Sequence, residues 1–119
     1  MDDAGFLRLT TDDQGHARFS DWDPAVRPDH PEPHELGVST PLPASAAVVV
    51  RAPAGGGHPR QPEARRQLTV LLSGSCTITA TGGTRCCGPG DVLLVEDTTG
   101  WGHSSDTSDG FTALLIPLE

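Results

Sequence analysis

Hydrophobic and polar residues alternate along many short segments of this chain, and glycine, proline or aspartate separates most of the segments. Alternation with a period of two is typical of β-strands that have one buried face, whereas an amphipathic helix repeats about every 3.6 residues. The pattern predicts strands at residues 6–11, 16–20, 46–51, 67–72, 75–80, 84–87, 92–95 and 111–118. Short strands with regular turn signals and no helical period indicate an all-β sandwich or barrel.

Two of the predicted strands, 67–72 and 75–80, form a hairpin in this interpretation, and its two faces differ in polarity. One face is apolar and consists of Leu68, Val70, Leu72, Cys76, Ile78 and Ala80. It is expected to pack against a second sheet or a second subunit. The other face carries Gln67, Thr69, Leu71, Ser73, Ser75, Thr77 and Thr79. This second face either meets solvent or lines a polar cavity with Gln67 at its depth.

Proline divides the chain into two parts. Residues 21–45 hold six of the eleven prolines, so this segment is neither helix nor central strand. We therefore expect residues 1–45 to form an N-terminal hairpin and a proline-rich arm that pack on the outside of a barrel or across a dimer. Residues 46–119 form the barrel itself, and its segment 52–62, rich in glycine and proline, is expected to be a connection.

Composition narrows the function further. The 119 residues suffice for one domain, and the net charge of −8, with eight arginines and no lysine, argues against nucleic acid as a partner. The absence of lysine removes Schiff-base chemistry. No apolar run approaches the roughly 18 residues of a membrane span, and the acidic start is unlike a signal peptide. We expect a cytoplasmic protein that makes no membrane contact.

The three cysteines are expected to be structural thiols. A two-residue turn at Gly82-Gly83 would put Ile78 opposite Cys87, which leaves Cys76 diagonal to Cys87 and in poor geometry for a disulfide. The spaced C-x-x-C pairs of cysteine metal sites are missing. Metal binding through these thiols is therefore not expected.

Polar residues lie at the ends of two predicted strands that glycine turns join. Gln67 begins one strand, while Asp97 and His103 follow the strand at 92–95. Their placement indicates a small-molecule site at the mouth of the barrel. Asp91, after Gly88-Pro-Gly90, is expected to fix that turn.

With these residues the chain resembles the cupins, which are small double-stranded β-helix (jelly-roll) barrels. The resemblance runs from about residue 51 to residue 117. Gln67 stands at the position of the glutamate in the first cupin motif, because six residues separate it from Gly74. The second motif begins at Gly90, and His103 is its histidine. The segment Gly88-Pro-Gly-Asp-Val-Leu-Leu-Val-Glu-Asp-Thr-Thr-Gly-Trp-Gly-His103 also resembles a bacterial group of small, poorly characterised cupins.

The resemblance implies a cupin-like jelly-roll fold and, in most members, a divalent metal held by two histidines, a glutamate or glutamine and a third histidine. Here Gln61 and Glu63 stand at the two histidine positions of the first motif, and His58 lies about three residues before them. Of the usual ligands, the resemblance therefore carries over Gln67 and His103.

Three functions remain open. In the first, His58 joins Gln67, His103 and Glu63 on a divalent ion such as Fe, Mn, Ni or Zn, as in a metal-dependent oxygenase or lyase. In the second there is no cofactor, and His103 is a general acid or base oriented by Asp97 or Glu96. In the third, the protein is a binding or regulatory module without catalysis.

We favour the second function, with no cofactor. It is a non-redox dehydration, isomerisation or cyclisation of a small oxygenated organic acid or polyketide-like compound, in a natural-product pathway. Strand parity with Gln67 points Arg65 rather than Arg66 into the cavity, where it would hold a carboxylate or enolate of the substrate. Trp101 would cover the substrate and Thr69 would contact it. A homodimer is expected from the apolar hairpin face and the open edges of the barrel.

Overall fold

The protein is all-β, as the alternating pattern predicts. The computed structural model describes residues 5–28 and 36–119, and these contain strands but no helix. The strands are β1 (Phe6–Thr11), β2 (Ala17–Asp21), β3 (Arg27–Pro28), β4 (Gly37–Val38), β5 (Val48–Ala52), β6 (Gly57–Gln61), β7 (Gln67–Gly74), β8 (Cys76–Ala80), β9 (Gly83–Cys87), β10 (Val92–Glu96), β11 (His103–Asp106) and β12 (Phe111–Pro117). Within the described ranges, no helix is long and apolar enough to cross a membrane.

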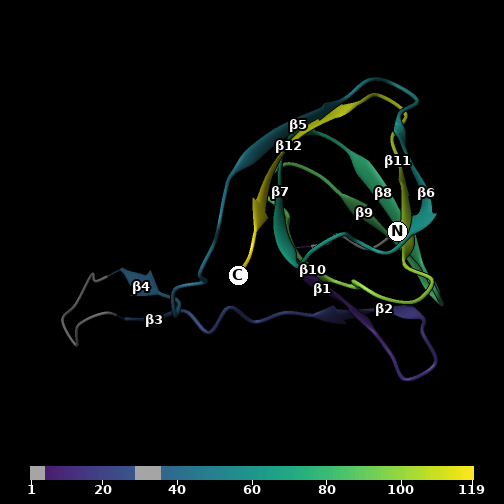
Figure 1. Ribbon diagram of the computed structural model, residues 1–119. Helices are drawn as coiled ribbons and strands as arrows, with labels where there is room; N and C mark the ends of the chain where they lie inside the picture. Colours follow the sequence, from purple (N-terminus) through teal and green to yellow (C-terminus); the bar gives the residue numbers. More distant parts are fainter. Residues whose placement is uncertain (1–4, 29–35) are drawn as a thin grey trace.

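Two sheets enclose the interior of the barrel (Figure 1). The larger has the strand order β2-β1-β10-β7-β12-β5, and the smaller has the order β6-β11-β8-β9. Consecutive strands β7 and β8 lie in different sheets, as do β10 and β11, so the chain repeatedly crosses from one sheet to the other. This crossing pattern closes a jelly-roll barrel around a shared interior.

The N-terminal hairpin is part of the barrel, which corrects the expectation that it packs on the outside. β1 pairs in parallel with β10 from Phe6–Val92 to Thr10–Glu96, and β2 continues the sheet on the other side of β1. Leu7 and Leu9 are only 3% and 1% exposed, so β1 supplies part of the main core. Parallel pairing joins strands that are remote in sequence, and local alternation carries no signal for it.

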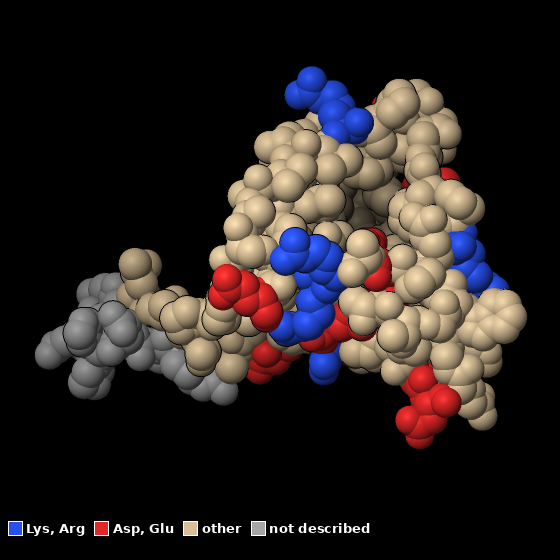
Figure 2. Space-filling view, viewed as in Figure 1, with Lys and Arg blue, Asp and Glu red and all other residues tan. Residues whose placement is uncertain are grey.

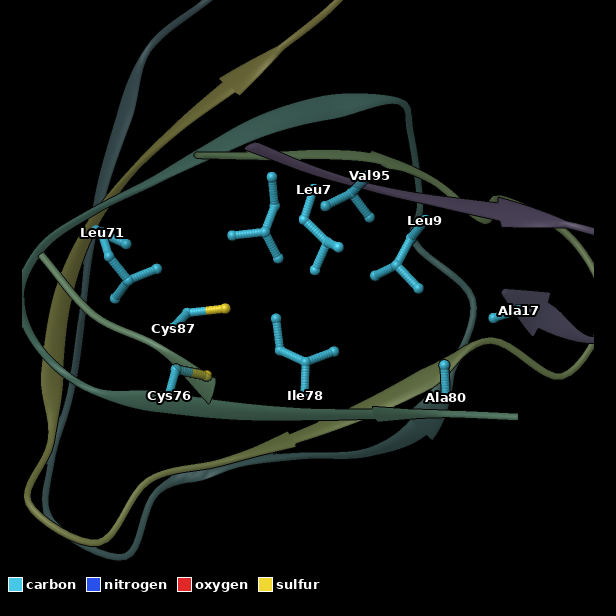
Figure 3. Close-up of a cluster of buried hydrophobic side chains, with 11 residues drawn as sticks. Leu7, Leu9, Ala17, Leu71, Cys76, Ile78, Ala80, Cys87 and Val95 are labelled. Carbon is cyan, nitrogen blue, oxygen red and sulfur yellow. The ribbon is translucent and has the colours of Figure 1, made fainter. Parts of the chain in front are cut away.

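The core fills one part of the barrel interior. Its buried members come from both sheets and are Leu7, Leu9, Ala17, Leu71, Cys76, Ile78, Ala80, Cys87, Leu93, Val95 and Ala113 (Figure 3). Alternate residues of β10 point inward, since Leu93 and Val95 belong to this cluster. The packed core is one wall of the cavity described below.

The predicted faces of the segments 67–80 are correct for β7 and wrong for β8. Because the two strands belong to different sheets, Cys76 and Ile78 face the same interior as Gln67 and Leu71. The crossing occurs at Gly74, whose φ is 77° and where an added Cβ would lie 2.1 Å from the carbonyl oxygen of Gly110. Only glycine fits such a close approach in the left-handed region.

Cys76 lies directly opposite Cys87, so the predicted diagonal placement is wrong. The β8–β9 turn consists of Thr81 and Gly82 rather than the two glycines, which shifts the register. Burial raises the pKa of the Cys76 thiol to about 11 and that of Cys87 to about 12. All three cysteines are free, and Cys76 and Cys87 pack in the core.

Two further strands of the barrel sheets arise where the sequence predicts none. β6 occupies part of the expected connection 52–62, and β11 lies between the predicted strands. The proline-rich arm behaves differently: β3 and β4 form a short ribbon that lies away from the barrel in Figure 1. Leu36, next to β4, is 82% exposed. Residues 29–35 of this arm lie outside the described part of the chain.

Candidate functional site

A cavity of about 260 Å³ lies beside the core, between the two sheets. Its apolar lining residues are Val50, Leu71, Ile78, Leu93, Val95, Phe111 and Leu115. The remaining lining residues are His58, Gln61, Glu63, Gln67, Thr69, Cys76, His103 and Ser105. Figure 2 shows a hollow on this face of the molecule, with acidic and basic groups below it. A cavity therefore lies where the sequence predicts one, but hydrocarbon rather than polar groups forms most of its wall.

Glycines on both sides of Trp101 fix the position of His103. Gly102 has a φ of 73°, and a Cβ at this position would lie 2.0 Å from the backbone of Gln61. Gly100 packs in the same way on Gly15, whose carbonyl oxygen accepts a hydrogen bond of 2.8 Å from the amide of Trp101. Residues 100–102 can thus pack directly against the backbone of Gln61 and Gly15. His103 begins β11 with its side chain in the interior, where the residue is only 4% exposed.

Both ring nitrogens of His103 face carboxylates. Nδ1 donates a hydrogen bond of 2.6 Å to Oδ2 of Asp97, and Nε2 lies 3.5 Å from Oε1 of Glu63. Asp97 is fully buried, whereas the Glu63 side chain is 24% exposed. Burial lowers the pKa of His103, but the hydrogen bonds to Asp97 and Glu63 outweigh it and raise the pKa to about 9. Without another cation, His103 is positively charged at neutral pH.

His58 comes from β6, the edge strand beside β11. Its ring centroid lies 5.0 Å from that of His103, and the two rings meet edge to face. Nδ1 of His58 lies 2.8 Å from the carbonyl oxygen of Pro59. A carbonyl oxygen can only accept, so Nδ1 carries a proton, and in the neutral ring Nε2 keeps its lone pair. Asp97 imposes the same tautomer on neutral His103, because its carboxylate also accepts from Nδ1.

These residues fit a divalent metal ion. His58, Glu63 and His103 each offer a ligand atom, and the three atoms lie within 4.8 Å of one another. Two imidazole nitrogens and a carboxylate oxygen are ligands that Zn, Fe, Mn and Ni all accept. In metal sites, a ligating histidine almost always donates its other N–H to a carboxylate or carbonyl, as His58 and His103 do here. Gln67 lines the same cavity and lies within the predicted ligand set.

Glu96, predicted to orient His103, instead forms ion pairs with Arg8 and Arg66. Inward and outward positions alternate along β10, so Val95 points into the barrel and Glu96 points away from it. Asp97, the next residue, supplies the carboxylate that reaches His103. Of Arg65 and Arg66, the one that points away from the cavity is expected to form a salt bridge. Arg66 does so with Glu96.

Arg65 and Trp101 also lie outside the cavity lining. Arg65 donates a hydrogen bond of 2.9 Å to Oγ of Ser45. The prediction that Arg65 points into the cavity is wrong because β7 begins only at Gln67, so the alternation of strand faces does not extend back to residue 65. Trp101 is 57% exposed and packs near His16, with the guanidinium of Arg60 5.9 Å from its ring. Neither residue is therefore placed to hold or cover a molecule in the cavity.

Gln67 and Thr69 do line the cavity, as predicted. Asp91 accepts hydrogen bonds from the amides of Gly5 and Gly88 and so fixes the turn, also as predicted. The sequence reasoning missed Ser105 and Phe111 as lining residues. Ser105 follows His103 by two positions on β11, so the alternation of strand faces could have identified it.

Comparisons with known proteins agree on the fold. Neither protein-family models nor curated protein sequences match the chain. Among solved structures, the cupin domain of Cnp3 from Schizosaccharomyces pombe superposes with a TM-score of 0.51, at 18% identity over 95% of this chain and 81% of that one. The chain has the cupin fold. A putative ethanolamine utilization protein Q from Salmonella typhimurium is similar too, with a TM-score of 0.53 and 16% identity over 94% of this chain and 93% of that one.

A conserved protein of unknown function from Streptococcus pyogenes matches part of the cupin barrel. Its TM-score is 0.51 and its identity 18%. The match covers 61% of this chain and 62% of that one, so this chain spans less than two thirds of that protein. At this level of identity, the three similarities establish the architecture.

Proposed function

We propose that this cupin binds a divalent transition-metal ion through His58, Glu63 and His103 and acts on a small molecule held in the adjacent cavity. The observation that carries the proposal is the tautomer of the two histidines. Pro59 and Asp97 accept from Nδ1 of His58 and His103, which leaves Nε2 of each ring for a ligand. A charge argument supports it as well, because Asp97 and Glu63 place two carboxylates around a single imidazole.

The residues of the chain divide the work. A bound ion of this kind supplies Lewis-acid polarisation of a carbonyl or hydroxyl oxygen. Asp97 keeps His103 in one orientation, and the amide of Gln67 offers both a donor and an acceptor to an oxygen of the ligand. The apolar wall of the cavity excludes water from the hydrocarbon part of the bound molecule. The reaction that we favour is non-redox, namely elimination, isomerisation or cyclisation of an oxygenated molecule.

Proton transfer without a metal is the second candidate, and the raised pKa of His103, about 9, is the observation that favours it. In this case His103 is an imidazolium that donates to Asp97 and to Glu63. Glu63 is partly exposed to the cavity and would take the substrate proton, while His103 would supply one.

Metal analysis of untagged protein separates the two candidates. We expect about one ion per chain after equilibration with Zn²⁺ or Co²⁺, and loss of that ion in His58→Ala and in His103→Ala. His16→Ala is the matched control, because His16 lies beside Trp101 and outside the cavity lining. The visible spectrum of the Co²⁺ form reports nitrogen and oxygen ligation directly. A wild-type protein that takes up no ion after dialysis against Fe, Mn, Ni and Zn would leave the metal-free candidate.

A further inference from the structure

The two ends of the cavity differ in polarity, and strand register shows which end is which. Gln67 starts β7 opposite Val95 of β10, at the end where the chain continues to Asp97 and His103. Leu71 lies four positions further along β7, near the crossing to Cys76. Phe111 pairs with Gly74 at that same far end. A ligand that fills the cavity therefore meets polar groups at one end and hydrocarbon at the other.

Among the described residues, no arginine or lysine side chain lines the cavity. The chain has no lysine, and the arginines whose side chains the structure describes make their contacts elsewhere. Arg8 and Arg66 pair with Glu96, and Arg18 pairs with Asp12. Arg51 and Arg65 approach hydroxyl groups of Thr112 and Ser45, while Arg60 and Arg85 lie over aromatic rings. An anionic group inside the cavity would thus find no arginine partner. Burying a carboxylate without a partner costs free energy, so the cavity disfavours an anion.

The charges at the polar end also disfavour an anion. The proposed divalent ion would balance the carboxylates of Glu63 and Asp97, leaving the centre close to neutral. Without the ion, these same two carboxylates lie around a single imidazole ring and oppose a further anionic group. In both states a neutral ligand costs the least to transfer from water into the cavity.

Size gives a further limit. The cavity volume of about 260 Å³ is below the roughly 300–1,000 Å³ of sites for drug-sized ligands. A water molecule occupies about 30 Å³ in the liquid, so the cavity has room for a molecule with on the order of ten non-hydrogen atoms.

We infer that the ligand of this cavity is a small neutral molecule with a hydrocarbon body and one hydroxyl or carbonyl group. The hydrocarbon body lies against Leu71 and Phe111, and the oxygen lies at the end formed by Gln67 and His103. This inference rests on the proposed function for the role of the oxygen, but the ligand class itself follows from the cavity wall. It replaces the organic acid that the sequence suggested, since Arg65 is not available to hold a carboxylate.

Three probes with one skeleton test the assignment: para-methylbenzyl alcohol, para-methylbenzoate and para-methylbenzylamine. They differ mainly in the charge at one end, and each is titrated by calorimetry into Zn²⁺-loaded and metal-free protein at neutral pH. We expect the alcohol to bind at least about tenfold more tightly than the benzoate or the ammonium form. Metal content is measured on the same samples.

Val50→Arg is expected to shift the binding preference from the neutral alcohol toward the anionic benzoate. Val50 lines the cavity from the edge strand β5 and is half-buried, so an arginine stem can follow the wall with its charge near the opening. We expect this substitution to improve benzoate binding relative to the alcohol by about tenfold. Val50→Met is the neutral control of similar length and should leave the ranking unchanged.

Each outcome decides between the hypotheses. Benzoate or ammonium binding as tight as that of the alcohol overturns the neutral-ligand assignment, whatever the metal content. Failure of all three probes to bind wild-type protein that does contain metal also overturns it and leaves the metal site intact. The expected ranking in protein that binds no metal supports the ligand class and contradicts the proposed metal function.

Discussion

Gly102 lies so close to Gln61 that a single methyl group at position 102 would overlap the backbone of its neighbour. The contact joins the loop that ends at His103 to the segment between His58 and Glu63. Two parts of the chain that carry the candidate ligands are therefore held against each other by the absence of a side chain.

Gly102→Ala should loosen this junction. The positive φ of 73° and the 2.0 Å approach both oppose a Cβ. We expect a loss of about 2–4 kcal/mol in the free energy of unfolding and weaker Co²⁺ binding. Urea denaturation and Co²⁺ titration measure the two effects. Gly88→Ala is the control, because a Cβ there meets nothing within 4 Å. Equal stability of the two variants would contradict this account of the loop.

Asp97→Asn should weaken metal binding although Asp97 is not itself among the candidate ligands. The amide removes the carboxylate that accepts from Nδ1 of His103. Metal affinity is expected to fall by about 10- to 100-fold, as for other residues that orient a ligating histidine. In metal-free protein, the pKa of His103 measured by NMR should fall from about 9. Asp109→Asn, at an exposed position, is the control; unchanged affinity and pKa in a folded Asp97→Asn would reject the orienting role.

The ion pairs of Glu96 should make stability depend on acid pH. Burial raises the pKa of Glu96, but the hydrogen bonds from Arg8 and Arg66 outweigh burial, and the pKa lies below its usual 4.5. A carboxyl whose pKa is lower in the folded state adds stability above its unfolded pKa, and that stability disappears as pH falls through the folded value. Glu96→Gln should therefore lower Tm at neutral pH, and the difference from wild type should shrink below about pH 4. Asp13→Asn, in the exposed β1–β2 turn, should show no such convergence.

A homodimer stays a prediction, and the outer face of the larger sheet is where we expect it to form. Val49 on β5 and Leu72 on β7 are 64% and 51% exposed, with β12 between their strands, and exposed apolar surface commonly marks an interface. Light scattering after size-exclusion chromatography should give about twice the chain mass. Leu72→Asp should shift the protein to monomer, whereas Thr79→Asp, on the other sheet, should not. A monomeric wild type at high micromolar concentration would end this expectation.

The sequence identifies the main elements and the histidine at the centre of the site, because both depend on local signals. Alternation predicts β7 and β10, and the glycine-bounded segment before His103 predicts its position. The same alternation favours Asp97 over Glu96, since Leu93, Val95 and Asp97 share one face of the chain. The error over Glu96 was thus avoidable. The error over Arg65 depended on where β7 begins, which is set by pairing with β10 and β12.

Other features depend on contacts between remote segments. β6 reads Gly-His-Pro-Arg-Gln and has no apolar alternation, yet it forms a strand because β11 supplies its hydrogen-bond partners. That pairing places His58 beside His103 and makes the metal alternative more favourable than the sequence suggested. The parallel pairing of β1 with β10 is likewise absent from any local pattern.

The position of β6 at the edge of the smaller sheet has a kinetic consequence. Among the described strands, β11 alone pairs with it, and two of the three candidate ligands, His58 and Glu63, lie on or just after β6. Fraying of this one strand would take both ligands away together and open the wall of the cavity. The lifetime of a bound ion would then follow the rate at which the edge strand detaches, and amide hydrogen exchange in β6 should slow when the ion is present.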